Sequence, residues 1–188
     1  MSVLATNCIV LPTLEAYHIM QDNKHEFCQI RSAVESDFVA ISALVRENAQ
    51  YVKVKDTTLQ SADELVEDGL KSSPPKFYCL VCVIGDEVVG YCTYNSAYST
   101  WVGRMINILD FYVRECNRKQ VQDDFVKFLV KKANDIGCKR IAWLARKDAV
   151  EYNDFWTRHG SIDITLKEEW IQYRLESDKF QSLIDRCS

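Results

Sequence analysis

The sequence predicts an α+β fold in which a mixed, mostly antiparallel sheet carries helices on both faces. Three apolar, strand-like runs follow one another in the middle of the chain, and a Gly-Asp turn signal separates the first two. Apolar residues at helical spacing occur both before and after these runs, so helices are expected on either side of them in the sequence. The three central runs are 77–84, 88–94 and 104–113.

The N-terminal part of the sequence predicts an extension, one strand and two helices. Residues 1–25 are expected to be irregular, or partly helical around Leu14 to Met20, and residues 27–30 to form a strand. A helix follows, because capping residues precede an apolar stripe at helical spacing. Ser61 and Glu64 have the spacing of a capping box, so a second helix begins there. The stripe of the first helix consists of Phe38, Ile41, Leu44 and Val45.

After the third central run, the sequence alternates between helices and strands. A helix over 119–136 ends at Gly137, and Asp148 is expected to cap the next helix, which closes at His159-Gly160. The order of elements is that of one domain over residues 26–188. The remaining expected elements are strands over 139–145 and 170–175 and a last helix over 177–186.

Composition restricts the classes of function. The chain has 188 residues, 47% of them hydrophobic, which is enough to bury one sizeable core. Its formal net charge of -4 gives no general support for nucleic-acid binding, which usually needs a basic surface. No apolar run reaches the ~20 residues of a membrane span, and we expect no membrane association.

Eight cysteines do not indicate a disulfide framework here, because the chain is long, ordinarily apolar and begins without a secretory signal pattern. Cys79 and Cys82 fall in one strand-like run, where an offset of three residues puts them on opposite faces. That is poor geometry for zinc, and no metal site is expected. We therefore expect reduced, mostly buried thiols in a cytoplasmic or nuclear protein.

Several short motifs together resemble one family. The main match is the run from Tyr98 to Arg104, followed by Ile108 to Val113. In this order and spacing, the motifs are similar to those of the spermidine/spermine and thialysine acetyltransferases, a branch of the GNAT superfamily. The resemblance covers roughly residues 27–176 and implies the GNAT fold, a homodimer, and acetyl transfer from acetyl-CoA to an amine. Supporting matches are Ile30-Arg31-Ser32-Ala33, Glu67-Asp68-Gly69, Gly137-Cys138 and Glu168-Glu169-Trp170.

The first part that the resemblance implies is a cradle for the cofactor's pyrophosphate, written R/Q-x-x-G-x-G/A. Its glycines let backbone N–H groups approach the phosphates at a helix N-terminus. Val121 takes the place of the first glycine, and its side chain is expected to project toward the cofactor. Asp123 takes the place of the second and adds negative charge. The whole aligned run is Arg118, Lys119, Gln120, Val121, Gln122 and Asp123.

The second implied part is a carboxylate base, and the third is an acid that reprotonates the departing thiolate. The family's Leu-Glu-Asp pattern reads Ile108-Leu109-Asp110 here, so Leu109 stands at the base and cannot accept a proton. Its neighbour Asp110 points to the other face of the strand and is at most a stand-in. Trp156 takes the place of the tyrosine that serves as the acid in the family, and its indole N–H does not usefully give up its proton. Tyr152, one helical turn earlier, is the other stand-in, and Ala149 replaces a cofactor-binding asparagine.

Loss at all three places predicts a catalytically inactive GNAT-like homodimer that binds no cofactor and acts as an adaptor or scaffold for a protein partner. The vacated cleft is expected to be apolar, lined by Leu109, Val121 and Trp156.

Two alternatives stay open. One is an active acetyltransferase that uses acetyl-CoA on a polyamine, a small amine or a protein lysine. The other is nucleic-acid contact through a basic patch around Lys127, Lys131 and Lys132, which the net charge disfavours.

Overall fold

The structure, a computed structural model, describes residues 17–19, 28–53 and 59–187. The chain divides into two compact units, residues 1–144 and 145–188, which we describe separately. The strands of the first unit are β1 (Tyr17–Ile19), β2 (Cys28–Ser32), β3 (Tyr78–Ile84), β4 (Glu87–Ser99), β5 (Gly103–Val113) and β6 (Arg140–Ala142). Its helices are η1 (Glu35–Asp37), α1 (Phe38–Tyr51), α2 (Ala62–Val66), η2 (Glu67–Lys71) and α3 (Glu115–Asp135). The second unit holds α4 (Val150–Arg158), α5 (Ile164–Glu168), η3 (Ser177–Lys179) and α6 (Phe180–Cys187).

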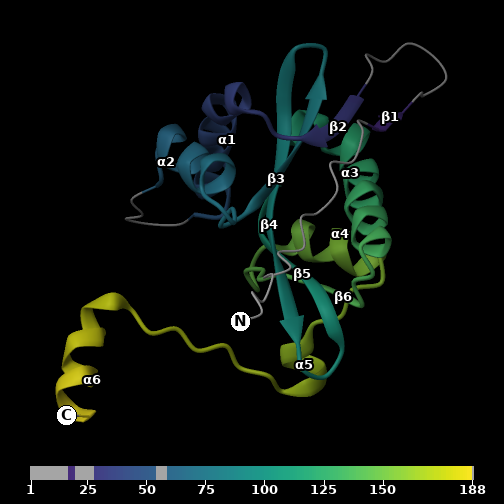
Figure 1. The fold of residues 1–188 in the computed structure, drawn as a ribbon. Coiled ribbons are helices and arrows are strands. Elements are labelled where there is room, and N and C mark those ends of the chain that lie inside the picture. The colour runs from purple at the N-terminus through teal and green to yellow at the C-terminus, as the bar shows by residue number, and fades with distance from the viewer. Residues whose placement is uncertain (1–16, 20–27, 54–58, 188) are drawn as a thin grey trace, which may run out of the picture. The chain divides into compact units, whose positions relative to one another are not determined.

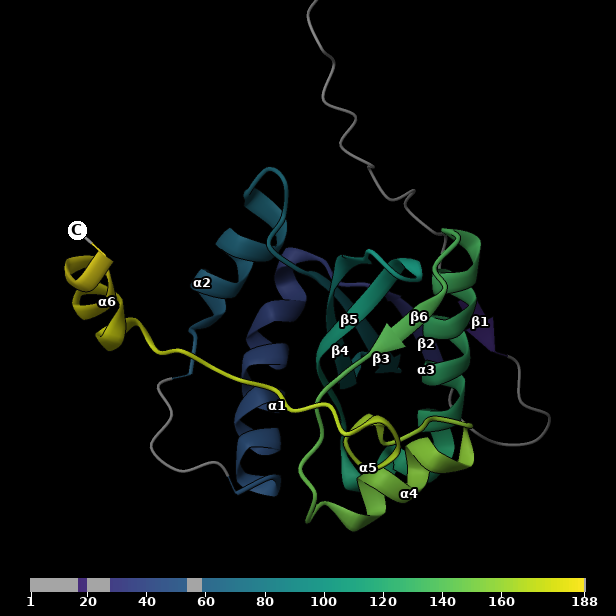
Figure 2. The same ribbon diagram turned by 90° about the horizontal axis from the view of Figure 1, so that it is seen from below.

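The first unit is built on one six-stranded sheet whose spatial order follows the sequence, β1 to β6 (Figure 1). Strands β1 to β5 pair antiparallel, and β6 pairs parallel with residues 105–107 of β5. Helices α1 and α3 lie on opposite faces of this sheet (Figure 2). The expected α+β class, with a mixed, mostly antiparallel sheet and helices on both faces, is confirmed.

The core of the first unit has one layer on each side of the sheet. Beneath α1, Phe38 and Ile41 join Val81 and Tyr91 of the strands in one buried cluster. Beneath α3, the ring centroids of Phe111 and Phe125 lie 5.3 Å apart. In each layer the helix contributes apolar residues that recur at helical spacing. This spacing is the pattern from which α1 and α3 were predicted.

Several local predictions are confirmed. The capping box at α2 is present: the Glu64 N–H donates to Ser61 Oγ at 3.2 Å, and the Ser61 N–H donates to Glu64 Oε2 at 2.7 Å. The three central strands are present, although β4 continues to Ser99, into the segment expected to be a loop. Pairing with β5 explains this extension, because the register continues to Ser99 opposite Gly103.

Three predictions are wrong. Residues 170–175 form no strand, because no segment of the described chain pairs with them. Residues 17–19, expected to be irregular or helical, form a strand because they pair with β2. Helix α3 begins at Glu115 instead of residue 119. The single-domain boundary at 26–188 stays a prediction.

Candidate functional site

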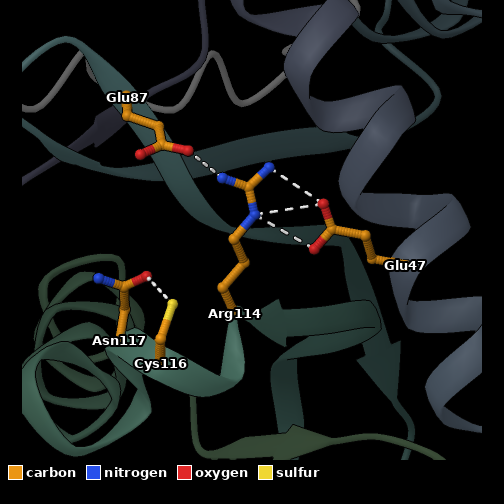
Figure 3. A network of polar contacts seen from close by, with 5 residues as sticks. All are labelled: Glu47, Glu87, Arg114, Cys116 and Asn117. Atoms are coloured by element: carbon orange, nitrogen blue, oxygen red, sulfur yellow. Dashed lines mark hydrogen bonds and ion pairs between the residues drawn. The ribbon is translucent and has the colours of Figure 1, made fainter.

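The start of α3 is held in place by a network of ionic hydrogen bonds (Figure 3). Arg114 precedes the helix, and its guanidinium donates to both carboxylate oxygens of Glu47 on α1, at 3.0 to 3.2 Å. It also donates to Glu87 at the start of β4. The backbone N–H of Arg114 donates to the Val89 carbonyl at 2.9 Å. The helix therefore begins at a point fixed by α1 and β4.

Because α3 begins at Glu115, residues 118–123 lie within the helix and form no loop. In an α-helix only the first four N–H groups lack a carbonyl partner within the helix. The N–H groups from residue 119 onward are directed along the helix axis, to carbonyls four residues earlier. The run that the family resemblance aligns with the phosphate loop is thus regular helix, in agreement with the helix predicted over 119–136, and most of its N–H groups cannot reach a phosphate.

Two side chains of this run, those of Val121 and Arg118, make contacts within the folded unit. Val121 is completely buried, so it does not project toward a cofactor or line an open groove, and both expectations are wrong. Helical periodicity explains this, because Val121 and Phe125 are four residues apart and share the face that meets the sheet. The Arg118 guanidinium lies 4.3 Å from the centre of the Tyr51 ring, and its Nε donates to the Val113 carbonyl at 3.0 Å.

The remaining residues of the run are polar and carry charges of both signs. Lys119 and Asp123 are exposed, and Gln120 and Gln122 are half-buried. Glu115 places a carboxylate in the first turn of α3, where it stabilises the helix through the macrodipole. That same position is where the dipole of a helix favours phosphate, so the glutamate competes with an anionic ligand.

Leu109 occupies a β-bulge. In the register of β4 with β5, Thr93 pairs with Asp110 and Tyr94 pairs with Ile108, so Leu109 is left without a partner residue. Its side chain is 52% exposed. The bulge thus directs an aliphatic side chain to the surface at the position where the family resemblance implies a base.

Asp110 points inward from the same bulge and is held by neutral donors. Asn48 Nδ2 on α1 donates to Asp110 Oδ1 at 2.7 Å, and the Tyr91 hydroxyl on β4 donates to Oδ2. The Phe111 N–H also donates to Oδ1, at 3.0 Å. Burial raises the pKa of Asp110, although these hydrogen bonds act to lower it. Burial also raises the pKa of Tyr91.

Sequence reasoning missed Asn48 and Tyr91 as partners of Asp110. Asn48 lies 62 residues away along the chain and Tyr91 lies 19 away. The alternation of strand residues gives the face on which Asp110 lies, but only the register of β4 with β5 and the packing of α1 bring these partners to it.

In the second unit, Trp156 lies on α4 and is buried. Its ring makes edge contacts with Phe155 at 5.3 Å and with Tyr152 at 6.1 Å between centroids. Tyr152, the stand-in acid, is half-buried and lies one turn earlier on the same face, as the sequence indicated. Trp156 thus contributes to the aromatic packing of this unit.

The start of α4 differs from the prediction. Ala149 is the residue that precedes the helix, and its methyl group cannot cap an N–H. Asp148, the expected cap, lies one residue before that position, and its carboxylate is paired with Arg146 at 2.7 and 2.8 Å. His159 ends the helix, as expected, with Nδ1 2.8 Å from the Phe155 carbonyl oxygen.

The lysines of the proposed basic patch do not form a continuous positive surface. Lys127 is paired with Asp124 at 3.0 Å and Lys131 with Asp135 at 2.8 Å. Lys132 is buried, and burial lowers the pKa of its ammonium group. Within the described residues, no cluster of three or more His, Cys, Asp or Glu side chains could hold a metal ion. No helix in this part of the chain is long and apolar enough to cross a membrane.

Comparison with known proteins identifies the family. No family model matches the chain. The thialysine N-epsilon-acetyltransferase of Bos taurus is 34% identical over 170 residues, which are 84% of this chain and 97% of that protein. Its counterpart in Sus scrofa is 36% identical over 166 residues, covering 82% of this chain and 95% of that protein.

Solved structures agree on the fold. A ribosomal-protein-alanine N-acetyltransferase from Brucella melitensis superposes with a TM-score of 0.62 at 14% identity, over 79% of this chain and 98% of that one. From the identity to the thialysine acetyltransferases, together with this fold, the chain belongs to the GNAT superfamily, in the branch of the spermidine/spermine and thialysine acetyltransferases.

Proposed function

We propose that this GNAT protein does not transfer acetyl groups efficiently and acts instead as a protein-binding adaptor or scaffold. The observation that carries the proposal is the helical state of residues 118–123, with Val121 in the core. A pyrophosphate cradle needs several free N–H groups directed at one point, and N–H groups inside a helix already have partners. Acetyl-CoA therefore lacks its main anchor, and we expect no bound cofactor.

The bulge at Leu109 supports the same proposal. A base must lie within hydrogen-bond reach of the amine or of a water between them, and the side chain directed outward here is aliphatic. Asp110 is engaged by Asn48 and Tyr91 on the inner side. In the second unit, Trp156 offers an indole N–H, which does not exchange its proton usefully.

The alternative function is acetyl transfer to an amine, and two observations favour it. Relatives at 34 to 36% identity over nearly their whole length are named thialysine N-epsilon-acetyltransferases. Asp110 is also a carboxyl group whose pKa is raised by burial, a property that proton-transferring carboxyls in enzymes share. In this alternative, Asp110 and Tyr152 take over proton transfer with acetyl-CoA as cofactor.

Acetyl-CoA binding and transfer separate the two functions. We expect acetyl-CoA, added in excess to the full chain, to leave the melting temperature unchanged, because the cradle is absent. Labelled acetyl transfer to thialysine or spermidine should stay at the no-enzyme background, with an active thialysine acetyltransferase as the positive control. A saturable rise in melting temperature, with transfer that Asp110→Asn and Tyr152→Phe abolish, would establish the alternative.

We also infer that the chain forms a homodimer through its C-terminal segment. The apolar residues of this segment alternate along an extended stretch and are mainly exposed: Tyr173 is 87% exposed and Ile171 is 68% exposed. In α6, Phe180 and Ile184 lie four residues apart on one face, and both are exposed. An exposed, extended apolar segment and an exposed apolar helix face gain stability when a second copy covers them.

Light scattering across a range of protein concentrations tests the dimer. We expect the doubled mass for the wild-type chain and the single mass for the Ile171→Asp, Tyr173→Asp double variant. Gln172→Asp is the control, because it places one negative charge between these two positions and leaves both apolar side chains in place. A single mass for the wild-type chain at all concentrations contradicts the dimer.

A further inference from the structure

Two cysteines from neighbouring strands meet in the interior of the first unit. Cys28 opens β2 and Cys82 lies in β3, 54 residues apart in the sequence, and their Sγ atoms are 2.9 Å apart. In the antiparallel register, Cys28 pairs with Ile84 and Ile30 pairs with Cys82, so the two cysteines are diagonal neighbours on one face of the sheet. The two sulfur atoms need to approach by less than about 1 Å to reach the S–S bond length of about 2.05 Å.

The two thiols differ in access and in acidity. Cys82 is completely buried, whereas Cys28 retains 9% of its surface. A hydrogen bond from the Cys82 thiol lowers the pKa of Cys28, although burial and the nearby charge of Asp124 act against this. The pKa of Cys82 is raised by that hydrogen bond and by burial. Cys28 is thus the thiol that ionises and meets reagents first, and Cys82 is the thiol behind it.

We propose that Cys28 and Cys82 form a thiol modification site that a peroxide or a low-molecular-weight disulfide oxidises to a cross-strand disulfide. This inference does not depend on whether the protein transfers acetyl groups. The site differs from those of Cys79 and Cys116: Cys79 is buried among apolar residues on the opposite face of β3, and Cys116 is exposed at the start of α3.

The chemistry balances in two steps. With a peroxide, the Cys28 thiolate attacks an oxygen atom, the O–O bond breaks, and Cys28 becomes a sulfenic acid as hydroxide leaves. The Cys82 sulfur then attacks the Cys28 sulfur, the S–O bond breaks, and the Cys82 proton leaves with the hydroxyl group as water. Two thiols are oxidised and one peroxide is reduced. With a disulfide reagent such as oxidised glutathione, a mixed disulfide at Cys28 replaces the sulfenic acid, and a glutathione thiol leaves at each step.

The bond would tie β2 to β3 and close a loop that contains α1 and α2. Closing a long loop removes conformations from the unfolded chain, so the oxidised protein should unfold at a higher urea concentration than the reduced protein. The cross-link lies on the face of the sheet opposite the cluster beneath α1, since Val81 and Val83 belong to that cluster and Cys82 lies between them.

Peptide mapping of the wild-type full chain tests the site directly. The reduced protein is treated with hydrogen peroxide or, separately, with oxidised glutathione; free thiols are then alkylated and the protein is digested without reductant. We expect one cross-linked peptide pair containing Cys28 and Cys82, formed at a rate independent of protein concentration and reversed by dithiothreitol. Exposed Cys116 should enter no internal disulfide.

Variants identify the order of the two thiols. In Cys82→Ala, the intermediate should accumulate at Cys28, as a dimedone-reactive sulfenic acid with peroxide and as a glutathione adduct with oxidised glutathione. Cys79→Ala is the matched buried control and should cross-link like the wild type. Circular dichroism verifies that each variant is folded. Failure of the wild-type chain to form the 28–82 pair while Cys116 is oxidised would overturn the proposal, as would a link from Cys28 to another cysteine.

Discussion

Two inward-pointing carboxyl groups of the first unit are stabilised in opposite ways. Asp37, in η1, faces the Arg31 guanidinium at 2.6 and 3.0 Å and accepts the Val34 N–H at 2.7 Å. Asp110, in β5, faces a phenol, a side-chain amide and a backbone N–H. Burial acts to raise the pKa of both groups. At Asp37 the hydrogen bonds and the charge of Arg31 outweigh burial, so its pKa is lowered, whereas at Asp110 burial prevails.

The difference means that Asp37 keeps its charge as part of the fold, whereas Asp110 can gain or lose a proton. A carboxylate paired with a guanidinium stays ionised and ties β2 to the start of α1. A carboxyl group held by neutral donors keeps most of these hydrogen bonds in either protonation state, so protonation alters its charge more than its position. Asp110 is therefore the residue through which the alternative, catalytic function would have to work.

The largest effect should follow from removing the cation beside Asp37. Arg31→Ala leaves a carboxylate with 7% of its side chain exposed and no guanidinium, and we expect a loss of about 3 kcal/mol in the free energy of unfolding. Urea denaturation measures this loss. Arg46→Ala, at an exposed position on α1, is the matched control and should change stability by less than about 0.5 kcal/mol. Equal effects of the two substitutions would show that the Arg31–Asp37 pair contributes nothing particular.

The next effect concerns the hydrogen bonds of Asp110. Asp110→Ala leaves the buried Tyr91 hydroxyl and the Asn48 amide without their acceptor, at a loss of about 2 kcal/mol. Asp110→Asn keeps an oxygen for Asn48 and an amide for Tyr91, so its effect should stay below about 1 kcal/mol. The same denaturation experiment distinguishes them. If the asparagine variant is as unstable as the alanine variant, the negative charge is required and the comparison with Asp37 fails.

The sequence predicted well what depends on local signals and poorly what depends on distant partners. The capping box at Ser61 and the turn between β3 and β4 are local, and both were found. The strand pattern at 170–175 is also local, but a strand needs a neighbour, and the described chain provides none.

The helical state of residues 119–123 was part of the predicted helix over 119–136, and the structure extends that helix back to Glu115. Arginine, lysine and glutamine are good helix formers, and the run contains no glycine to interrupt the helix. The alignment with a family whose members have glycines there treated the same run as a phosphate loop, and the structure agrees with the helix. The buried position of Val121 follows from the same helix, once its start at Glu115 is known.

A smaller effect should be visible in the pH dependence of stability. Because the pKa of Asp37 is lower in the folded than in the unfolded chain, its contribution is present above the unfolded pKa of about 4 and is lost as the pH falls through the folded value. The pKa of Asp110 is raised, so its contribution is present below about pH 4 and is lost as the pH rises through the folded value.

Urea denaturation as a function of pH therefore distinguishes the two carboxyl groups. Relative to the wild type, Asp37→Asn should lose stability near neutral pH and approach the wild type in acid. For Asp110→Asn, the stability relative to the wild type should instead be highest near neutral pH, because the wild-type protein there carries the unfavourable ionised form of Asp110. Parallel curves for the two variants would mean that both carboxyl groups have the same charge state.

The smallest effect is expected at the third carboxylate arrangement, around Arg114 (Figure 3). Glu47 and Glu87 are 38% and 66% exposed, so water screens their attraction to Arg114. Arg114→Ala should lower the free energy of unfolding by about 1 kcal/mol or less, and added salt should reduce this loss. The loss caused by Arg31→Ala should persist in the same salt series, because Asp37 is buried and its pair is screened far less. A salt-independent loss of similar size at both arginines would contradict the expectation that the more buried ion pair contributes more stability. It would also mean that Arg114 fixes the start of α3 as firmly as the Arg31–Asp37 pair fixes the start of α1.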